Sequence, residues 1–433
     1  MQIFRPEQID TFIQTFESRR KSDEQNIIVS VREIVTAVRT RGDAALAEFA
    51  RRYDGCDIRN HGFYVSEAEL EDAYHALDPD LRQILHEAQE NIAKFHAKAL
   101  PQSWLTWEAD QVVLGQKVSA LQRVGVYVPG GRAAYPSSLL MGVIPAQVAG
   151  VEEIIISTPA NRDGQVNPTI LAAAHLLGIH RVLRVGGAQA IAAMAYGTET
   201  VPRVDKIVGP GNAYVATAKK MVFGDVGIDM VAGPSEVVII GDHQANPDYV
   251  AADLLAQAEH DPLSSAILLT PSADLATAVA AAVEAQLDTL ERREIILESL
   301  TNYGAILQTE DLQSCIEICN RLAPEHLGLH IQDAWSLLGA IQTAGAIFIG
   351  SYSPEAVGDY WAGPNHVLPT NGAGRFLSPL RTEDFLKTSS IVAYSPGAMQ
   401  RNGNKIIRFA QAEGLTAHAH SIRVRIDSHP DRS

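Results

Sequence analysis

The chain has few cysteines and no stretch that could cross a membrane. Its 433 residues include three cysteines, Cys56, Cys315 and Cys319, which are too few for a disulfide framework and fit a reducing compartment. No apolar run approaches the roughly 20 residues of a membrane span. The first residues, from Met1 to Pro6, lack the apolar core of a secretion signal. We therefore expect a cytoplasmic protein without a membrane partner.

A long basic run is also missing, and the net charge is -16. Nucleic acids and anionic membranes attract positive charge, so neither is the expected partner. Acidic residues are spread over the expected helix faces, where they favour solubility. Hydrophobic residues make up 46% and charged residues 20% of the chain, as in ordinary soluble globular proteins. The length exceeds that of one compact core and predicts at least two domains.

A third absence is the G-x-G-x-x-G sequence of common dinucleotide-binding domains. Three shorter glycine turns are present instead: Val126–Gly131, Val185–Gln189 and Gly209–Asn212. The second and third each follow an expected strand and open an expected helix, where free backbone N–H groups can bind a pyrophosphate. Either turn alone is also a common connection between a strand and a helix. Both together at neighbouring strand ends favour an anionic ligand, and Tyr127 could line its pocket, but NAD does not follow from them.

What is present is an alternation of strands and helices. Residues 1–100 read as helices, and short β-rich runs follow from Trp104 to Val128. Strand and helix then alternate in two runs, over 153–223 and over 236–349. This pattern is typical of parallel sheets covered by helices on both faces, and two runs indicate two α/β units. After Thr382 the chain ends in a strand and two helices, a tail too small to fold alone.

The segment from Gly358 to Thr370 is the most informative one. It places an acid, Asp359, and an imidazole, His366, among glycines and prolines. The glycines and prolines restrict the backbone and so hold the neighbouring side chains in fixed directions. We therefore expect a loop without a helix, held in place for a site.

Four residues form a candidate metal-binding set. Gln257 and His260 lie three apart near the end of an expected helix, and hence on one face of it. Asp359 and His418 add an oxygen and a nitrogen donor, and this set suits zinc. A single histidine at a helix end is usually a cap or a surface residue, and spacing alone does not bring the four together.

Two other turns carry polar side chains. Glu325 and His326 follow a helix break and form either a solvated polar loop or a general acid/base pair, since histidine titrates near neutral pH. Ser235, within Gly233–Glu236, either belongs to a turn that enters a strand or donates a hydrogen bond to a substrate.

Taken together, the motifs resemble those of histidinol dehydrogenases, most specifically from about Val124 to Arg425. The motifs that carry the resemblance are, in chain order, Gly125–Gly131, Val185–Ile191, Val204–Asn212, Asp229–Glu236, Gln257–His260, Ala323–Leu327, Gly358–Pro369 and Ala412–His418. One such match could arise by chance, whereas eight in the same order could not reasonably do so.

The resemblance implies a zinc-dependent, NAD-linked, four-electron oxidation of L-histidinol to L-histidine through L-histidinaldehyde, the last step of histidine biosynthesis. The implied ligands of one zinc ion per subunit are Gln257, His260, Asp359 and His418. The implied catalytic pair is Glu325 and His326, and the implied NAD-binding residues are Tyr127, Gln189 and Asn212. The implied substrate contacts are Ser235, Gln257, His260, His326, Asp359, His366, Glu413 and His418.

The resemblance also implies two Rossmann-like α/β domains with parallel sheets, similar to aldehyde dehydrogenases, with one unit inserted into the other. The expected parts are an N-terminal helical segment (1–23), a discontinuous α/β domain (24–129 and 237–375), an inserted α/β domain (130–236) and a C-terminal tail (376–433). The family is homodimeric with a tail that crosses to the partner, so Glu413 and His418 should reach the partner's site.

In the implied mechanism, His326 takes the alcohol proton as hydride leaves to NAD, and Glu325 activates water to hydrate the aldehyde. Zinc orients the substrate as a template. A thiohemiacetal route to the acid would need an activated thiolate. Cys315 and Cys319 lie in the middle of an expected helix, away from the candidate site segments, so we reject that route.

Three other functions are alternatives. A related enzyme acting on another alcohol, such as a sulfonated diol, should differ at the substrate end, and the presence of Ser235 and Glu413 favours histidinol. A zinc hydrolase would not need the paired glycine turns at Gly186 and Gly209. A non-catalytic metal-binding protein would need no acid/base pair.

Overall fold

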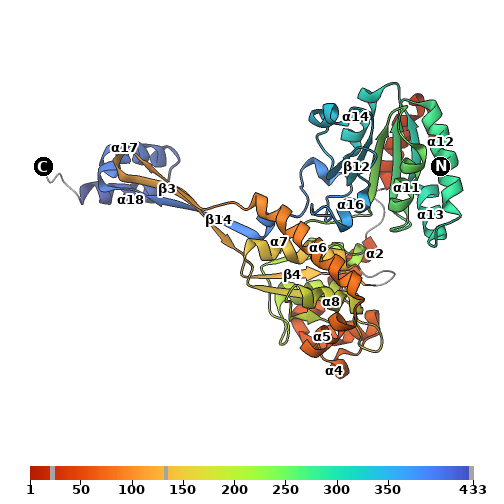
Figure 1. Ribbon diagram of the computed structural model, residues 1–433. Coiled ribbons are helices and arrows are strands. Elements are labelled where there is room, and N and C mark those ends of the chain that lie inside the picture. The colour runs from red at the N-terminus through yellow and green to blue at the C-terminus, as the bar shows by residue number, and fades with distance from the viewer. Residues whose placement is uncertain (20–24, 131–134, 429–433) are drawn as a thin grey trace. The chain divides into compact units, whose positions relative to one another are not determined.

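The computed structural model describes residues 1–19, 25–130 and 135–428. Gly131, the last residue of the first glycine turn, and 20–23, the end of the expected N-terminal segment, lie outside these residues. The chain divides into two units (Figure 1). Unit 1 comprises Met1–Ala99 and Leu121–Phe385, and unit 2 comprises Leu100–Ala120 and Leu386–Ser433.

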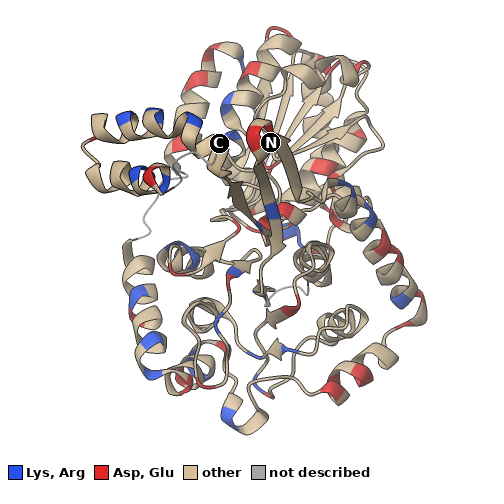
Figure 2. Cartoon of the chain, turned by 90° about the vertical axis from the view of Figure 1, so that its left-hand side faces the viewer, with Lys and Arg blue, Asp and Glu red and all other residues tan. Residues whose placement is uncertain are grey.

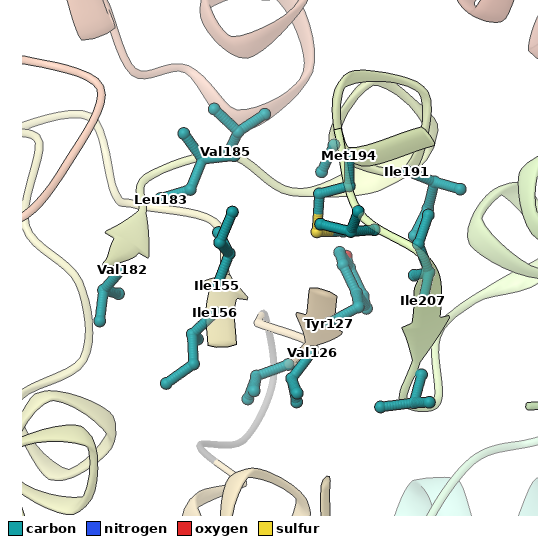
Figure 3. Packing of buried hydrophobic residues seen from close by; sticks show 14 of the residues in the cluster. Val126, Tyr127, Ile155, Ile156, Val182, Leu183, Val185, Ile191, Met194 and Ile207 are labelled. Carbon is teal, nitrogen blue, oxygen red and sulfur yellow. The ribbon is translucent and has the colours of Figure 1, made fainter. Parts of the chain in front are cut away.

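The first sheet of unit 1 has five parallel strands in the order β6–β5–β4–β7–β8. Its strands are β4 (Arg123–Tyr127), β5 (Glu153–Ser157), β6 (Val182–Leu183), β7 (Lys206–Val208) and β8 (Gly227–Ile228). Their central residues are apolar and mostly β-branched, which suits parallel strands that are buried on both faces. Figure 3 shows Val126, Ile155 and Ile207 of this sheet near Met194 of the helix α9 (Gly187–Tyr196).

Helices from the N-terminal hundred residues share the core of this first sheet. Val31, Leu46, Leu70 and Leu85 are buried in the same cluster as the strands. The helices around the sheet are α2 (Gln25–Arg41), α3 (Asp43–Phe49), α4 (Ile58–His61), α5 (Glu67–Ala76), α6 (Pro79–His96), α7 (Pro136–Ala149), α8 (Pro168–Leu176), α9 and α10 (Ala213–Val222).

The second sheet of unit 1 has six parallel strands in the order β1–β11–β10–β9–β12–β13. Alternate residues of β9 enter different cores, Val237 and Ile239 on one face and Val238 and Ile240 on the other, because successive strand side chains point to opposite faces. The strands are β1 (Gln2–Phe4), β9 (Glu236–Gly241), β10 (Ser265–Thr270), β11 (Gly304–Gln308), β12 (His326–His330) and β13 (Ala346–Ile349).

Two layers of helices cover the second sheet. Val250 and Val279 pack in the core on the Val237 face of the sheet, and Ile13 and Ile316 pack in the core on the opposite face. The helices of this half are α1 (Pro6–Arg19), α11 (Pro247–Ala258), α12 (Ala273–Leu287), α13 (Arg293–Tyr303), α14 (Leu312–Leu322), α15 (Ala334–Leu337) and α16 (Glu355–Tyr360).

Unit 2 is built from two segments that are far apart in the sequence. Its antiparallel sheet has the order β14–β3–β2. The strands are β2 (Trp104–Glu108), β3 (Val112–Ala120) and β14 (Leu386–Ala393), and the helices α17 (Pro396–Ala412) and α18 (Thr416–Asp427) pack against each other. Asp110, in the turn between β2 and β3, forms an ion pair with Arg401 of α17. This ion pair connects α17 to the sheet.

The strand pairings place several segments differently from the expected domains. Strand β4 pairs with β5 and β7, so residues 123–127 belong with the expected insertion 130–236 and not with 237–375. The N-terminal strand β1 pairs with β11 of the second sheet. Residues 100–120 join the C-terminal tail through β3. The local pattern predicted most of these strands, but pairing depends on distant partners that the pattern does not specify.

One local expectation is wrong. The segment Gly358–Thr370 was expected to contain no helix, but α16 includes Gly358, Asp359 and Tyr360. Pro354 stands just before this short helix, where proline is tolerated, and the helix-breaking residues Gly363 and Pro364 come after its end. The helix therefore fits between these residues, and the remainder of the segment, through Thr370, is irregular as expected.

Charged residues lie mainly on the helices, and the strands carry few of them (Figure 2). In the described residues, no helix combines the length and the apolar character that a membrane crossing requires.

Candidate functional site

A cavity of about 1040 Å³ lies at the carboxyl ends of the first sheet's strands. The three residues predicted to bind NAD, Tyr127, Gln189 and Asn212, all line it. In open parallel sheets, ligands bind outside the carboxyl ends of the strands. The structure thus brings the glycine turns of the sequence to a single cavity of a size suited to a cofactor.

The turn between β6 and α9 is held by side chains of the cavity wall. The Gly187 N–H donates to the Tyr127 hydroxyl at 3.0 Å, and the Gly186 N–H donates to Asp54 at 3.0 Å. Burial raises the pKa of Tyr127 to about 12 and that of Asp54 to about 6. Asp54 was not predicted, because nothing in its local sequence links it to a turn more than a hundred residues away.

The turn between β7 and α10 depends on glycine and on a buried ion pair. Gly209 has φ +114°, and a Cβ there would lie 2.1 Å from the Tyr127 carbonyl oxygen. Lys219 pairs with Asp229; it donates to the Gly209 carbonyl at 2.9 Å, while the Gly209 N–H donates to Asp229 at 2.8 Å. Asn212 then caps α10 by accepting backbone N–H groups. The backbone of the turn is therefore fixed without a ligand.

A second group of polar residues lies at the amino ends of β9 and β12. Glu325 and His326, expected in a loop, stand just before and at the first residue of β12. Glu325 accepts the Glu236 N–H at 2.9 Å and lies 3.7 Å from Nδ1 of His326. Ser235 also hydrogen-bonds to the Glu325 carboxyl group. The predicted acid/base pair and Ser235 therefore lie together.

The contacts of His326 determine which ring nitrogen carries the proton. Nδ1 lies 3.1 Å from the Glu236 carbonyl oxygen. Because a carbonyl only accepts, Nδ1–H is the donor, and Nε2 keeps its lone pair. Burial lowers the pKa of His326 to about 4 and raises the pKa of Glu325 well above its usual value. His326 is thus a neutral imidazole with one basic nitrogen at neutral pH.

Next to this pair is a cluster that could hold a metal ion. His260, Glu355 and Asp359 have ligand atoms that all lie within 4.8 Å of one another. Nε2 of His260 lies 3.9 Å from Glu355, and Asp359 lies 3.6 Å from Nδ1 of His366. Gln257, at the end of α11, is fully buried beside them. Three of the four predicted zinc ligands are therefore in this cluster.

The pKa shifts in the cluster reflect crowded acids. Burial, followed by the charges of Asp359 and Glu325, raises the pKa of Glu355 well above its usual value. Burial also favours protonation of Asp359, but the hydrogen bond and charge of His366 outweigh it and lower the Asp359 pKa. Burial lowers the pKa of His260. Carboxylate, imidazole and amide oxygen together are a donor set that zinc accepts, and a cation would relieve the repulsion between the acids.

Sequence reasoning missed Glu355. It is one helical turn before Asp359 in α16, and residues four apart lie on the same face of a helix. The expectation that this region is not helical concealed that relation. A helix ending at Tyr360 would have pointed to Glu355 as a neighbour of the predicted ligand.

Two predicted site residues belong to unit 2. Glu413 is the C-terminal cap of α17, and His418 lies in the first turns of α18; both are exposed. Their predicted contacts with zinc and substrate stay predictions.

The cysteines have surroundings that suit packing. Cys315 and Cys319 are buried in α14, and Cys56 is buried in the core of the first sheet. Burial raises the pKa of Cys315 to about 11 and that of Cys319 to about 12. Neither thiol is set up as a thiolate nucleophile, which agrees with the rejection of a thiohemiacetal route.

A cofactor-sized cavity on one parallel sheet and a buried carboxylate–imidazole cluster on the next are features of an α/β enzyme that binds a cofactor. A sequence-family model described as histidinol dehydrogenase matches residues 17–426. The chain belongs to the histidinol dehydrogenase family, as the motifs predicted.

Similar proteins cover nearly the whole chain. The histidinol dehydrogenase of Halalkalibacterium halodurans is 54% identical over 398 residues, which are 92% of this chain and 93% of the relative. That of Bacillus subtilis is 54% identical over 396 residues, 92% of each chain. The crystal structure of histidinol dehydrogenase from Elizabethkingia anophelis has a TM-score of 0.90 at 36% identity, and covers 99% of this chain and 98% of that one. The predicted α/β fold class is confirmed.

Proposed function

We propose that this protein oxidises L-histidinol to L-histidine through L-histidinaldehyde, with two NAD molecules as oxidants and with zinc, in the last step of histidine biosynthesis. The family match over residues 17–426 carries the proposal. The neutral, buried His326 beside Glu325 supports it, because both oxidations require removal of a proton from oxygen as hydride leaves.

In this mechanism His326 receives the hydroxyl proton at Nε2, while Nδ1–H stays bonded to the Glu236 carbonyl. Glu325 is the group that activates water for hydration of the aldehyde, and His326 again accepts a proton in the second oxidation. Tyr127, Gln189 and Asn212 bind NAD in the cavity that they line. Burial of the acid/base pair excludes bulk water, which strengthens the electrostatic interactions within the site.

For zinc we propose Gln257, His260, Asp359 and His418 as ligands. The first three belong to the described cluster, and their oxygen and nitrogen donors suit the ion. When bound, zinc supplies a template that orients the substrate. Ser235, His366 and Glu413 complete the proposed substrate contacts, and the carboxylate of Glu413 suits a cationic amine.

We further propose a homodimer in which unit 2 supplies Glu413 and His418 to the partner's site. Unit 2 exposes large apolar side chains: Trp107 is 73%, Phe409 70% and Val392 68% exposed. Exposed apolar residues gathered on a small unit are typical of an interface. A cytoplasmic location belongs to the same proposal, since all three cysteines are free.

The activity test is the number of NADH molecules formed per L-histidinol consumed, with and without prior removal of metal by a chelator. Two NADH per substrate, lost on chelation and restored by zinc, would support the proposal. Turnover of a different alcohol or diol, with none of histidinol, would assign the protein to a related activity.

The dimer test mixes two inactive variants, His326→Asn and His418→Asn, after unfolding and refolding together. If each site combines His326 of one subunit with His418 of the other, a mixed dimer has one intact site and activity reappears. Activity that stays absent in dimers shown to be mixed would contradict shared sites.

A further inference from the structure

Glu355 occupies a central position in the metal-binding cluster. Its side chain is only 6% exposed, and its oxygens lie 3.9 Å from Nε2 of His260 and 3.8 Å from Nδ1 of His326. These distances are too long for hydrogen bonds. Its close contact is instead with Gln257, one of whose terminal amide atoms lies 2.9 and 3.2 Å from the two Glu355 oxygens.

That contact determines which way the Gln257 amide points. An ionised carboxylate, the form of Glu355 that a bound cation favours, only accepts hydrogen bonds, so the atom that faces it is the amide nitrogen. The same nitrogen lies 3.2 Å from Nδ1 of His326. That ring nitrogen already donates to the Glu236 carbonyl, so we assign the amide hydrogens to Glu355. The amide oxygen of Gln257 then faces away from Glu355.

Orientation matters because only one end of an amide binds a metal ion. The amide oxygen is a zinc ligand and the NH₂ group is not, yet the two ends have nearly the same shape. A buried glutamine without a fixed partner could present either end. Groups outside the coordination sphere commonly fix the orientation of a ligand in this way.

We infer that Glu355 is a positioning residue, which holds the Gln257 NH₂ group so that the amide oxygen faces the zinc ion. The inference rests on the proposed zinc site. The rival role is direct ligation, since Glu355 lies with His260 and Asp359 in one group of possible ligands. Against ligation, both Glu355 oxygens already face the Gln257 nitrogen, and a zinc–oxygen bond of about 2.0–2.2 Å would compete with that contact.

A double-mutant cycle on zinc affinity separates the two roles. The proteins are the full-length wild type, Glu355→Leu, Gln257→Ala and the double variant, each freed of metal. Zinc dissociation constants are measured by competition with a chromophoric chelator. We expect Glu355→Leu to weaken zinc binding about 10- to 100-fold in the wild type, and by less than about 3-fold when Gln257 is already absent.

Two further variants control the experiment. Glu355→Gln keeps an oxygen acceptor and should retain most of the zinc affinity that Glu355→Leu loses. Asp253→Asn removes a neighbouring negative charge that is bonded to His330 at 3.0 Å, and should change zinc affinity by less than about 3-fold if orientation rather than charge is decisive. Thermal unfolding of the metal-free proteins shows whether each variant folds, and Glu355→Ala replaces the leucine variant if it does not.

Each other outcome has a definite meaning. An equal loss of affinity from Glu355→Leu in both backgrounds would overturn positioning and favour direct ligation. A loss in Asp253→Asn as large as that in Glu355→Leu would overturn it in favour of a general charge effect. A wild-type protein that binds no zinc would overturn the proposed metal site together with this inference.

Discussion

The cavity on the first sheet and the polar cluster on the second sheet differ in how their charges are balanced. Beside the cavity, the charges of Lys219 and Asp229 neutralise each other, and both residues bind the backbone of Gly209. Such a pair is stable only when its remaining hydrogen bonds are made, and here they are. The turn is therefore formed before a nucleotide arrives.

The cluster on the second sheet is balanced differently. In the ion pairs of the described residues, Glu325, Glu355 and Asp359 have only histidines as partners, and burial lowers the pKa of His326 and His260. Only Asp359 has its charge favoured, because the hydrogen bond and charge of His366 lower its pKa, whereas burial raises the pKa of Glu325 and of Glu355. The first region is therefore complete without a ligand, whereas the second contains a group of residues, His260, Glu355 and Asp359, that could hold a cation.

The largest expected effect is on chemistry in the second region. His326→Asn removes the basic Nε2, so both oxidations should slow by about 10³-fold or more. Zinc should stay bound, because His326 is not among the proposed ligands. Steady-state NADH formation and metal analysis of the same sample check this. Loss of zinc together with activity would show that His326 supports the metal rather than the proton transfer.

A change in the first region should affect stability instead. Lys219→Met leaves Asp229 buried without its partner, and removing one member of a buried pair costs about 3–5 kcal/mol. Calorimetric unfolding of the metal-free protein should show a lower melting temperature. The double variant Lys219→Met with Asp229→Asn removes both charges and should recover part of the loss. Wild-type stability in the single variant would contradict this account of the turn.

Glu325→Gln distinguishes the two oxidations at the second site. The amide keeps an acceptor for the Glu236 N–H but is a poor base, so aldehyde oxidation should fall about 10²-fold while alcohol oxidation falls less. The two steps are measured separately, starting from L-histidinol and from L-histidinaldehyde. Equal losses in both would exclude water activation as the specific role of Glu325.

The smallest expected effect is a pH dependence of stability from α6, which packs beside the first sheet. Burial lowers the pKa of His96 to about 4, so the folded state disfavours the charged ring. The contribution of neutral His96 to the free energy of unfolding is fully present above about pH 6.5, where the unfolded histidine is also neutral. It is lost as the pH falls toward 4. The loss should be on the order of 2–3 kcal/mol, and His96→Gln should remove it. Unfolding curves at pH 7 and pH 4.5 for both proteins provide the comparison.

The glycine turns of the first region were predictable because their determinants are local. Gly186, Gly209 and Asn212 each stand where a strand ends and a helix begins within a few residues. The structure places the predicted NAD contact of each of the three turns in one cavity. What was missed there is Asp54 and the Lys219–Asp229 pair. Asp54 is 132 residues from its partner Gly186. Lys219 and Asp229 are closer to each other and to Gly209, but charge pattern alone does not specify their pairing.

The second region was predictable only through motifs. The structure brings Gln257, His260 and Asp359 together, but their selection followed from the family resemblance and not from spacing. Glu355 was missed because proline and glycine on both sides suggested a loop, whereas a helix of six residues fits between them. Short helices make few local hydrogen bonds and depend on tertiary packing, so sequence patterns reveal them poorly.

The discontinuity of unit 2 has a consequence for how the chain is made. Strand β3 is synthesised early, but its partner β14 emerges from the ribosome only after the whole of the second sheet. Until then β3 has an open edge on which any other strand could pair. Since domains fold as they emerge, N-terminal parts first, unit 1 can fold before the second segment of unit 2 has been synthesised. Emergence of β14, rather than folding of either sheet of unit 1, then sets the time at which unit 2 can be completed.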